Sequence, residues 1–273
     1  MSAQATLEIN VKKILRDKAG SKAKYVPGFV VKWLERILHQ EEINEFLVIH
    51  KNEEGLQWLE SVIKYLNISL KVTGLENLPA EDGKHYTFVS NHPLGGIDGV
   101  ALGLVLGKHY HSKVRYLLND ILMNLPGLKP LGVPVNKTGR QNRDNVRLVD
   151  EAFRSDNQII VFPAGLCSRT IGGKVQDLPW KKTVVQKSVQ SHRDIVPIFF
   201  SGQNSKRFYR IANFSKLLKF NFAMLYLADE VYKSRNKQFE IHIGKPISWQ
   251  HFDNSHTPTQ WAQWLRQQVY DLQ

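Results

Sequence analysis

The stretch Val89-Ser90-Asn91-His92-Pro93-Leu94-Gly95-Gly96-Ile97-Asp98 joins two apolar runs through a glycine-containing turn. Residues 86–89, before the turn, are β-branched or aromatic and predict a short buried strand. Residues 100–106, after the turn, are apolar and predict a buried helix. His92 would then follow a strand, and Asp98 would lie where a helix begins. Ligands bind at that edge of an open α/β sheet, and the exposed N–H groups of a helix start favour a carboxylate.

The remaining chain repeats this alternation of strands and helices. Further apolar segments, and one that alternates strictly at 239–243, predict strands at 69–72, 114–118, 131–135, 158–162, 195–200 and 239–243. Helical spacing of apolar residues predicts helices at 30–38, 58–66, 145–154, 182–190 and 261–272. We therefore expect an α/β fold, with a mixed central sheet flanked by helices and an N-terminal helical extension. The predicted domains are a helical region at 1–69, which a membrane could adjoin, and an α/β domain at 70–273.

The composition favours a globular protein with an anionic partner. Of the 273 residues, 42% are hydrophobic and 23% are charged, and the formal net charge is +12. Such a charge predicts binding to nucleic acid, to an anionic membrane surface or to an acidic substrate. The single cysteine excludes an internal disulfide framework and a zinc site of the CxxC type, and we predict no metal.

The sequence lacks the apolar segments that direct a chain into or across a membrane. Residues 1–10 have no apolar core of signal-peptide type. No apolar run approaches the roughly 20 residues that a transmembrane helix requires. We therefore expect a cytoplasmic protein that lies peripherally on the inner face of the cell membrane.

Two basic stretches are open to more than one interpretation. Lysine and arginine dominate residues 12–36, which is typical either of a solvated helix face or of an amphipathic segment on anionic lipid. Residues 206–222 interleave basic residues with aromatic and aliphatic ones. That pattern suits single-stranded nucleic acid, a membrane interface, or a surface helix whose apolar face belongs to the core.

His92 and Asp98 form a candidate acid–base pair. A histidine can act as a general base near neutral pH, and it does so better when a carboxylate holds one of its ring nitrogens. The other histidines of the chain have no comparable setting. A histidine and an aspartate this close in sequence are not specific alone, but three later segments make the pattern specific.

Together with those segments, the chain resembles the lysophospholipid acyltransferase superfamily, which includes bacterial 1-acyl-glycerol-3-phosphate acyltransferases. Asn91-His92 with Asp98 resembles the first of four sequence blocks. The later blocks resemble, in family order, Gly132-Val133-Pro134-Val135-Asn136-Lys137, Phe162-Pro163-Ala164-Gly165-Leu166-Cys167-Ser168-Arg169 and Ile195-Val196-Pro197-Ile198. The resemblance covers most of the predicted α/β domain.

The resemblance implies transfer of an acyl group from acyl-CoA or acyl-acyl carrier protein to the hydroxyl of a lysolipid, without a further cofactor. It implies that His92 is the general base and that Asp98 orients it and stabilises the imidazolium. The substrate-binding residues that it implies are Asn91, Lys137, Arg140, Gly165, Leu166, Ser168 and Arg169. The expected partners are a lysolipid acceptor, acyl carrier protein or a CoA thioester, and an anionic membrane surface, with no nucleic acid.

The resemblance also implies specific substrate roles for some of these residues. Backbone N–H groups around Gly165 and Leu166 would face the oxyanion of the reaction. Lys137 and Arg169, with Arg140 as a further candidate, would hold anionic groups of the donor or the acceptor. The high positive charge agrees with this role, because the donors are acidic and the acceptor lies in an anionic membrane.

The chain departs from the family pattern in the first and third blocks. Five residues, 93–97, separate the histidine from the aspartate, which is one more than usual in the family. Gly95-Gly96 can absorb the extra residue because glycine accepts unusual backbone angles. In the third block, Ala164 and Leu166 replace a glutamate and a threonine, and Arg169 is displaced by one position. This variant resembles a divergent bacterial branch that acylates lyso-aminolipids such as lyso-ornithine or lyso-glycine lipids, which carry a carboxylate and no phosphate.

Other functional hypotheses compete with acyl transfer from a thioester. Cys167 could be a nucleophile paired with His92 in a lipid hydrolase or transacylase, or it could be a small buried side chain. A non-catalytic module that binds an anionic membrane or nucleic acid would also explain the charge. A further alternative is a degenerate family member that binds lipid without turnover.

Overall fold

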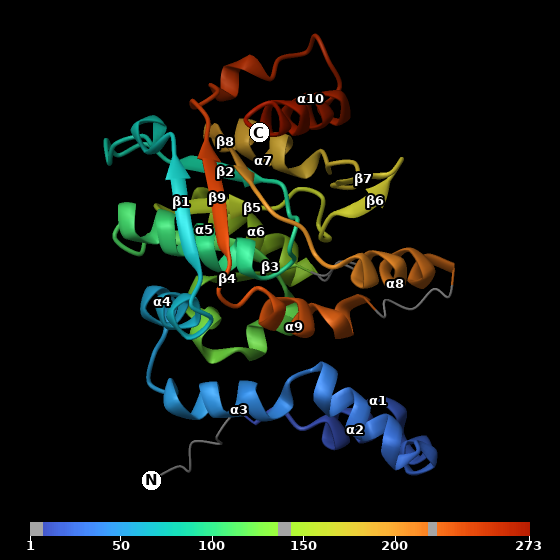
Figure 1. The fold of residues 1–273 in the computed structure, drawn as a ribbon. Helices are drawn as coiled ribbons and strands as arrows, with labels where there is room; N and C mark the ends of the chain where they lie inside the picture. Colours follow the sequence, from blue (N-terminus) through green and yellow to red (C-terminus); the bar gives the residue numbers. More distant parts are fainter. Residues whose placement is uncertain (1–7, 136–142, 218–222) are drawn as a thin grey trace. The chain divides into compact units, whose positions relative to one another are not determined.

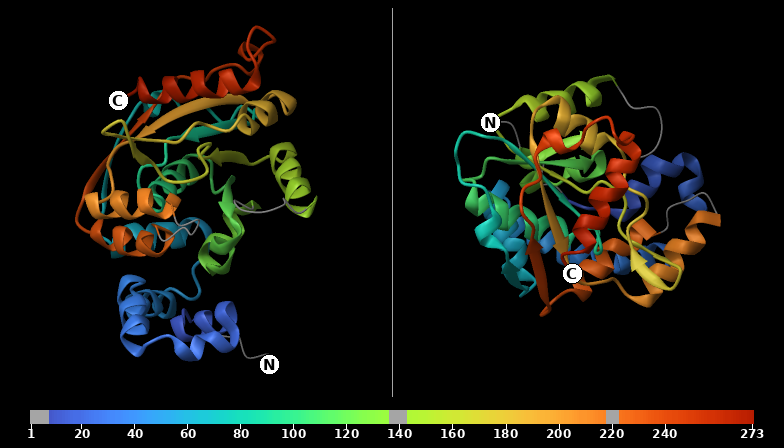
Figure 2. Two further views of the ribbon diagram at one scale, coloured as in Figure 1. Left: turned by 90° about the vertical axis from the view of Figure 1, so that its right-hand side faces the viewer. Right: turned by 90° about the horizontal axis from the view of Figure 1, so that it is seen from above.

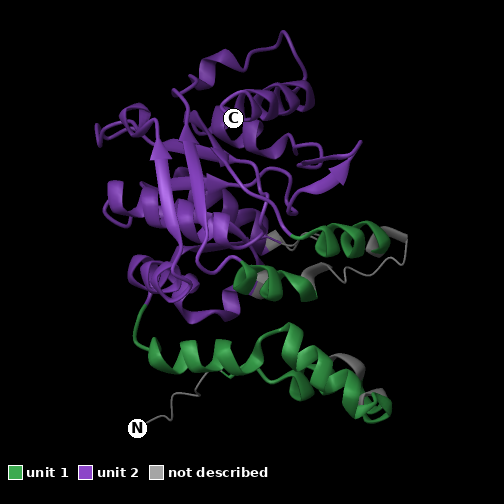
Figure 3. Cartoon of the chain, viewed as in Figure 1, with its two compact units in different colours: residues 1–53, 205–233 green, residues 54–204, 234–273 purple. Residues whose placement is uncertain are grey.

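The computed structural model of the protein describes residues 8–135, 143–217 and 223–273 (Figure 1). The chain forms two compact units (Figure 3). One combines residues 1–53 with 205–233, and the other combines residues 54–204 with 234–273. We call them the helical unit and the sheet unit, respectively. The two-domain division predicted at residues 69 and 70 stays a prediction.

A seven-stranded mixed sheet organises the sheet unit, which confirms the predicted fold class. Its strands are β1 (Ser69–Thr73), β2 (Tyr86–Ser90), β3 (Val114–Asn119), β4 (Gly132–Val135), β5 (Gln158–Val161), β8 (Asp194–Phe200) and β9 (Gln238–Ile243). They lie in the order β1-β9-β8-β2-β5-β3-β4. All neighbouring pairs are parallel except β8 and β9, which are antiparallel. The strand that precedes His92 therefore lies at the centre of the sheet.

Helices cover both faces of this sheet (Figures 1 and 2). The helices of the sheet unit are α4 (Gly55–Tyr65), α5 (Ile97–His109), α6 (Arg143–Arg154), α7 (Thr183–Gln190) and α10 (Pro258–Tyr270). Val89 of β2 belongs to the core cluster that α6, α7 and α10 form with one face of the sheet. Phe88, the preceding residue, contacts Tyr110 at the end of α5 on the other face. This alternation follows from the two-residue period of a strand.

Helix α5 lies between strand β3 and helix α4 in close contact with both. A Cβ atom on Gly103 would overlap the hydroxyl of Tyr116 on β3 and would lie 2.9 Å from a methyl group of Leu59 on α4. The Tyr116 hydroxyl donates to the carbonyl oxygen of Gly99 at 2.7 Å. Residues 99–107 of this helix are all glycine or aliphatic, as expected for a helix that is buried on two sides. This packing fixes the helix that carries Asp98.

The sequence patterns did not predict several shorter elements. After the third block, β6 (Arg169–Ile171) and β7 (Lys174–Gln176) form an antiparallel hairpin. The short 3₁₀ helices are η1 (Gly20–Tyr25), η2 (Leu75–Asn77), η3 (Asp120–Asn124), η4 (Pro126–Leu131) and η5 (Trp249–His251). The hairpin turns the chain back toward the loop that holds His92.

The helical unit joins the N-terminal helices to a later segment of the chain. Its helices are α1 (Val11–Ala19), α2 (Gly28–Ile37), α3 (Gln40–Ile49), α8 (Lys206–Leu217) and α9 (Ala223–Lys233). The His39 ring lies 3.4 Å from an oxygen of Asp229 on α9 and stacks on Tyr232. Trp33 of α2 makes an edge contact with Tyr226 of the same helix α9. The predicted extension therefore packs with α9.

Helix α8 carries the described part of the basic and aromatic stretch at 206–222. Phe208 and Tyr209 are buried, whereas Phe214 is 59% exposed. The predicted surface helix with an apolar face in the core agrees with this burial, and residues 218–222 lie outside the described residues. In the part of the chain that the structure describes, no helix combines the length and the apolar character needed to cross a membrane.

We predict that Gly103→Ala destabilises the sheet unit by about 1–3 kcal/mol, because the new methyl group must displace the Tyr116 hydroxyl. Urea unfolding followed by circular dichroism measures the change. Gly28→Ala on α2 is the matched control, because a Cβ there meets nothing within 4 Å. It should leave stability unchanged or raise it by up to about 1 kcal/mol. Equal effects of the two substitutions would contradict the close packing of α5.

Candidate active site

The carboxyl ends of three adjacent parallel strands meet at one edge of the sheet. Strand β2 lies between β8 and β5 and is parallel to both. Asn91 follows β2, and its side chain ties this edge to the end of β8. Its Oδ1 accepts from the N–H of Phe200 at 2.7 Å, and its Nδ2 donates to the carbonyl oxygen of Phe200 at 2.9 Å. Asn91 thus positions the loop, and its substrate-binding role stays a prediction.

His92 and Asp98 lie in contact, despite the five residues between them. The His92 Nδ1 is 3.0 Å from Oδ2 of Asp98. The turn brings them together because Gly95 adopts a φ of +80°, in the left-handed region that favours glycine. Its N–H donates to the same carboxylate oxygen at 3.2 Å. Gly95 therefore supplies the left-handed backbone angle in the turn that joins His92 to Asp98, and the accommodation of the extra residue by both glycines stays a prediction.

The Asp98 carboxylate is fully buried and satisfied by donors. Besides the ring of His92, it accepts from the N–H groups of Leu94 at 2.9 Å and Gly99 at 2.9 Å, and from Gly95. These donors come from the turn and the first residues of α5. A buried charge is tolerated only when such hydrogen bonds replace its hydration. Since Asp98 holds Nδ1, the proton on that nitrogen points to the carboxylate and Nε2 becomes the basic nitrogen.

An aromatic ring packs against one face of the His92 imidazole. Phe162, at the end of β5, stacks on the imidazole with ring centroids 4.2 Å apart. The His92 side chain keeps 12% of its surface exposed. Within the described residues, no hydrogen-bond partner occupies its Nε2. The geometry therefore presents a single basic nitrogen at the surface of the site.

The third block forms a tight turn beside that ring. Gly165 has a φ of +73°, and its N–H donates to the carbonyl oxygen of Phe162 at 2.9 Å. The N–H of Leu166 has no acceptor among the residues that the structure describes. Of the two residues predicted to face the oxyanion, Leu166 is thus the one with an available donor.

The later residues of the block contact the first block or their own segment. The N–H of Ser168 donates to the carbonyl oxygen of His92 at 2.8 Å. Arg169 is 4% exposed, and its Nη1 donates to the carbonyl oxygen of Cys167 at 2.6 Å and lies 3.0 Å from the sulfur. Cys167 is itself buried. The substrate-binding role of Arg169 and the nucleophile hypothesis for Cys167 stay predictions.

Sequence reasoning missed two polar residues that follow the β6–β7 hairpin, Asp177 and Trp180, which are both buried. An oxygen of Asp177 accepts from the backbone N–H of His92 at 3.1 Å. The Gly172-Gly173 pair was the available signal, because two glycines between short segments that contain β-branched residues are typical of a hairpin that returns the chain. The predicted Lys137 and Arg140 lie outside the described residues.

The environment of Asp98 favours its ionised form. Burial raises the pKa of the carboxyl, but the charge and hydrogen bond of His92, with the N–H groups of Leu94 and Gly95, outweigh it. The pKa of Asp98 is therefore lower than its ordinary value. A carboxyl with a lowered folded-state pKa adds stability above its unfolded pKa of about 3.9, and loses it as the pH falls through the folded value.

We predict that Asp98→Asn lowers the free energy of unfolding at pH 7 and that this difference shrinks as the pH falls below about 4. Denaturant unfolding at pH 7 and at a series of acidic pH values measures it. The control is Asp156→Asn, since the Asp156 side chain is 93% exposed, and its effect should stay within about 0.5 kcal/mol. A difference between Asp98→Asn and wild type that grew on acidification would contradict the lowered pKa.

Comparison with known proteins identifies the family to which the chain belongs. Two proteins named lyso-glycine lipid O-acyltransferase, from Phocaeicola vulgatus and Bacteroides thetaiotaomicron, are 57% and 55% identical to the chain over 274 residues. These alignments cover 100% of this chain, and 98% and 100% of the two relatives. The solved structure of the 1-acyl-sn-glycerophosphate (LPA) acyltransferase PlsC from Thermotoga maritima has a TM-score of 0.50 at 18% identity. It covers 96% of this chain and 94% of that one, which shows a shared fold.

The predicted resemblance is confirmed by a family model as well. The model described as "Acyltransferase" (Acyltransf_2) matches residues 13–273, which include the whole sheet unit and the helical unit from residue 13 onward. The chain therefore belongs to this acyltransferase family and is an acyltransferase.

Proposed function

We propose that the protein transfers a fatty acyl group from acyl-acyl carrier protein or acyl-CoA to the hydroxyl of a lyso-glycine lipid. The observation that carries the chemistry is the contact between His92 and buried Asp98, which leaves Nε2 available. The acceptor is inferred from the full-length identity to the two relatives of that name. Acyltransferases that act on a hydroxyl need a base for its proton, and His92 supplies it.

In the proposed reaction, Nε2 of His92 takes the proton of the acceptor hydroxyl while its oxygen attacks the thioester carbonyl. Asp98 holds Nδ1–H and stabilises the imidazolium that forms. The N–H of Leu166 faces the oxyanion of the tetrahedral intermediate. Collapse of this intermediate breaks the carbon–sulfur bond, forms the ester, and returns the proton from His92 to the departing thiolate. No covalent bond between acyl group and protein is required.

The charges of the side chains at the third block suit an acceptor that carries a carboxylate. Ala164 is buried at the position where the family pattern has a glutamate, so that side chain adds no negative charge here. The Lys181 ammonium lies beside the turn, 3.1 Å from where a Cβ on Gly165 would stand. Among the residues that the structure describes, Lys181 is therefore the candidate that would bind the carboxylate of the acceptor. Lys137 and Arg140 are proposed for the anionic groups of the donor.

The helical unit is proposed to bind an anionic membrane surface, on the inner face of the cell membrane. Tyr25 and Phe29 are each 75% exposed, and Ile14 is 46% exposed. Basic side chains lie among them along α1, η1 and α2: Lys12, Lys13, Arg16, Lys24, Lys32 and Arg36. Exposed apolar residues among cations are typical of helices that lie in a membrane interface. Such binding would bring the acyltransferase to a lipid acceptor.

We predict that His92→Ala lowers kcat/KM for acyl transfer to lyso-glycine lipid by about 10²–10⁴-fold, because the general base is lost. The assay follows thioester consumption with acyl-acyl carrier protein or acyl-CoA and offers lyso-glycine lipid, lyso-ornithine lipid and lysophosphatidate separately. Cys167→Ser is the control and should remain active. Activity lost in Cys167→Ser, with folding retained, would favour the thiol mechanism. Equal turnover in His92→Ala and wild type would contradict the proposed site, and preference for another acceptor would contradict the proposed substrate.

We predict that the double substitution Tyr25→Ser, Phe29→Ser weakens binding to vesicles of anionic lipid by at least about tenfold, since each ring contributes about 1.5–3 kcal/mol when buried. Vesicle co-sedimentation measures the binding, which added salt should also weaken. Val146→Ser, at a position of α6 that is 40% exposed, is the control and should bind like wild type. Binding to neutral vesicles that is insensitive to salt would contradict the proposal.

A further inference from the structure

Asp177 is a buried carboxylate that the proposed reaction does not use. It is 1% exposed and follows the β6–β7 hairpin directly. Its Oδ1 accepts from the backbone N–H of His92 at 3.1 Å and from the hydroxyl of Ser168 at 2.6 Å. Its Oδ2 accepts from the indole N–H of Trp180 at 2.9 Å. Both carboxylate oxygens are therefore engaged by donors.

These contacts close a ring around the backbone of His92. Asp177 holds the N–H of that residue, and the N–H of Ser168 holds its carbonyl oxygen at 2.8 Å. The Ser168 hydroxyl then connects back to Asp177. His92 is thus fixed at its main chain by this ring and at its side chain by Asp98. Two independent anchors determine where the imidazole lies.

Asp177 is itself held by the C-terminal helix. Its own N–H donates to the hydroxyl of Tyr270 at 2.8 Å, and Arg266 donates to its carbonyl oxygen at 3.0 Å. Arg266 also lies over the Tyr270 ring, 4.8 Å from its centroid. Helix α10, which packs on the sheet, therefore supports the backbone that presents this carboxylate to His92.

The groups around Asp177 donate hydrogen bonds to both of its side-chain oxygens, which suits a carboxylate and not the similarly shaped amide of asparagine. A backbone N–H and an indole N–H can only donate, so an asparagine would direct its own NH₂ group at one of its donor neighbours. Burial raises the pKa of Asp177, against the opposing hydrogen bonds of Ser168, Trp180 and His92. A carboxyl with a raised folded-state pKa loses stability as the pH rises above its unfolded value. The geometry of the donors, with both carboxylate oxygens accepting, is what distinguishes this aspartate from an asparagine.

We propose that Asp177 is a positioning residue for acyl transfer, which holds the main chain of His92 so that Nε2 stays in place for the acceptor hydroxyl. This inference rests on the proposed function, because it assigns a role in the same reaction. A displacement of a catalytic group by about 1 Å can cost roughly a hundredfold in rate. Loss of Asp177 should therefore affect turnover more than binding of the thioester donor.

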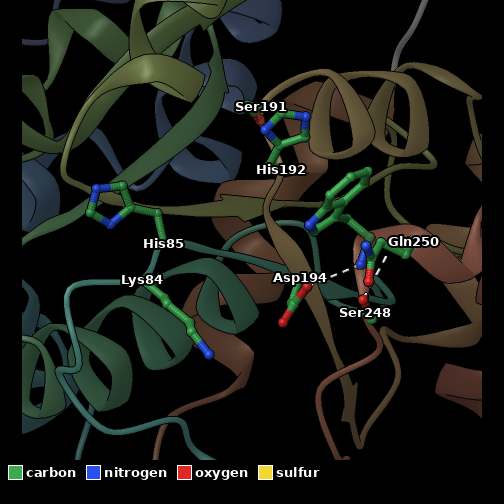
Figure 4. Close-up of a pocket in the computed structure, with 8 residues that line it drawn as sticks. Lys84, His85, Ser191, His192, Asp194, Ser248 and Gln250 are labelled. Atoms are coloured by element: carbon green, nitrogen blue, oxygen red, sulfur yellow. Dashed lines mark hydrogen bonds between the residues drawn. The ribbon is translucent and has the colours of Figure 1, made fainter.

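The chain offers a matched control at the opposite, amino-terminal ends of the central strands. Asp194 begins β8, and its Oδ1 accepts from the backbone N–H of Trp249 at 3.0 Å. It lines a polar pocket of about 420 Å³ with Lys84, His85, Ser191, His192, Ser248, Trp249 and Gln250 (Figure 4). Asp194→Asn thus alters a carboxylate with a similar backbone contact, at the amino ends of β2 and β8 rather than beside His92.

The experiment compares Asp177→Asn, Asp194→Asn and wild type by steady-state kinetics with lyso-glycine lipid, and by thermal unfolding. We expect kcat of Asp177→Asn to fall by about 10–100-fold while KM for the donor changes by less than about threefold. Asp194→Asn should keep the wild-type kcat. Ser168→Ala, which removes one bond of the ring, should lower kcat by a smaller factor and provides the test if Asp177→Asn does not fold. A folded Asp177→Asn variant with the kcat of wild type would overturn the proposal. If Asp177→Asn does not fold, a wild-type kcat in Ser168→Ala would overturn it instead.

A spectroscopic measurement separates failure of this inference from failure of the proposed function. The Nδ1 proton of His92, hydrogen-bonded to Asp98, should give a downfield NMR signal that is absent in His92→Ala. We expect this signal to shift or broaden in Asp177→Asn and to stay unchanged in Asp194→Asn. An unchanged signal in Asp177→Asn would overturn the inference even if no acceptor were acylated. Absence of transfer by wild type to every acceptor would instead contradict the proposed function.

Discussion

The buried carboxylate of Asp98 is the constraint on which the candidate site depends. It can stay ionised inside the protein only because the turn from residue 92 to 99 directs three backbone N–H groups and one imidazole at it. The same four donors fix the turn, the start of α5 and the tautomer of His92. A change in any of them would leave either a buried charge or a misdirected histidine. Structure and chemistry at this site therefore have a common cause.

The sheet topology gives this constraint its functional setting. Because β8, β2 and β5 are parallel neighbours, the segments that follow them converge although they are far apart in sequence. Phe162 reaches the His92 ring, and Asn91 reaches the end of β8. Parallel pairing of these strands thus brings the sequence blocks that follow them together in a single site. Helix α5, buried between β3 and α4, provides the rigid element on which Asp98 lies.

Much of this arrangement could be predicted from local patterns. Segments such as 86–89 and 158–162 identify central strands because strands buried on both faces are rich in β-branched, aliphatic and aromatic residues. Gly95-Gly96 identified the turn because only glycine adopts its backbone angles freely. The role of Asp177 could not be predicted, since its contacts with His92 and Tyr270 depend on the hairpin and on packing of α10. Nor does any local pattern show that 205–233 joins residues 1–53 in one compact unit.

The central claim is that His92, held by Asp98, moves the proton of the acceptor hydroxyl. The most direct test is kcat of Asp98→Asn at neutral pH, with saturating thioester and lyso-glycine lipid, on protein shown to be folded. An amide keeps the shape of the carboxylate but removes the charge that stabilises the imidazolium. The account predicts that kcat falls by about 10²–10⁴-fold in the folded variant. A kcat close to that of wild type would contradict it.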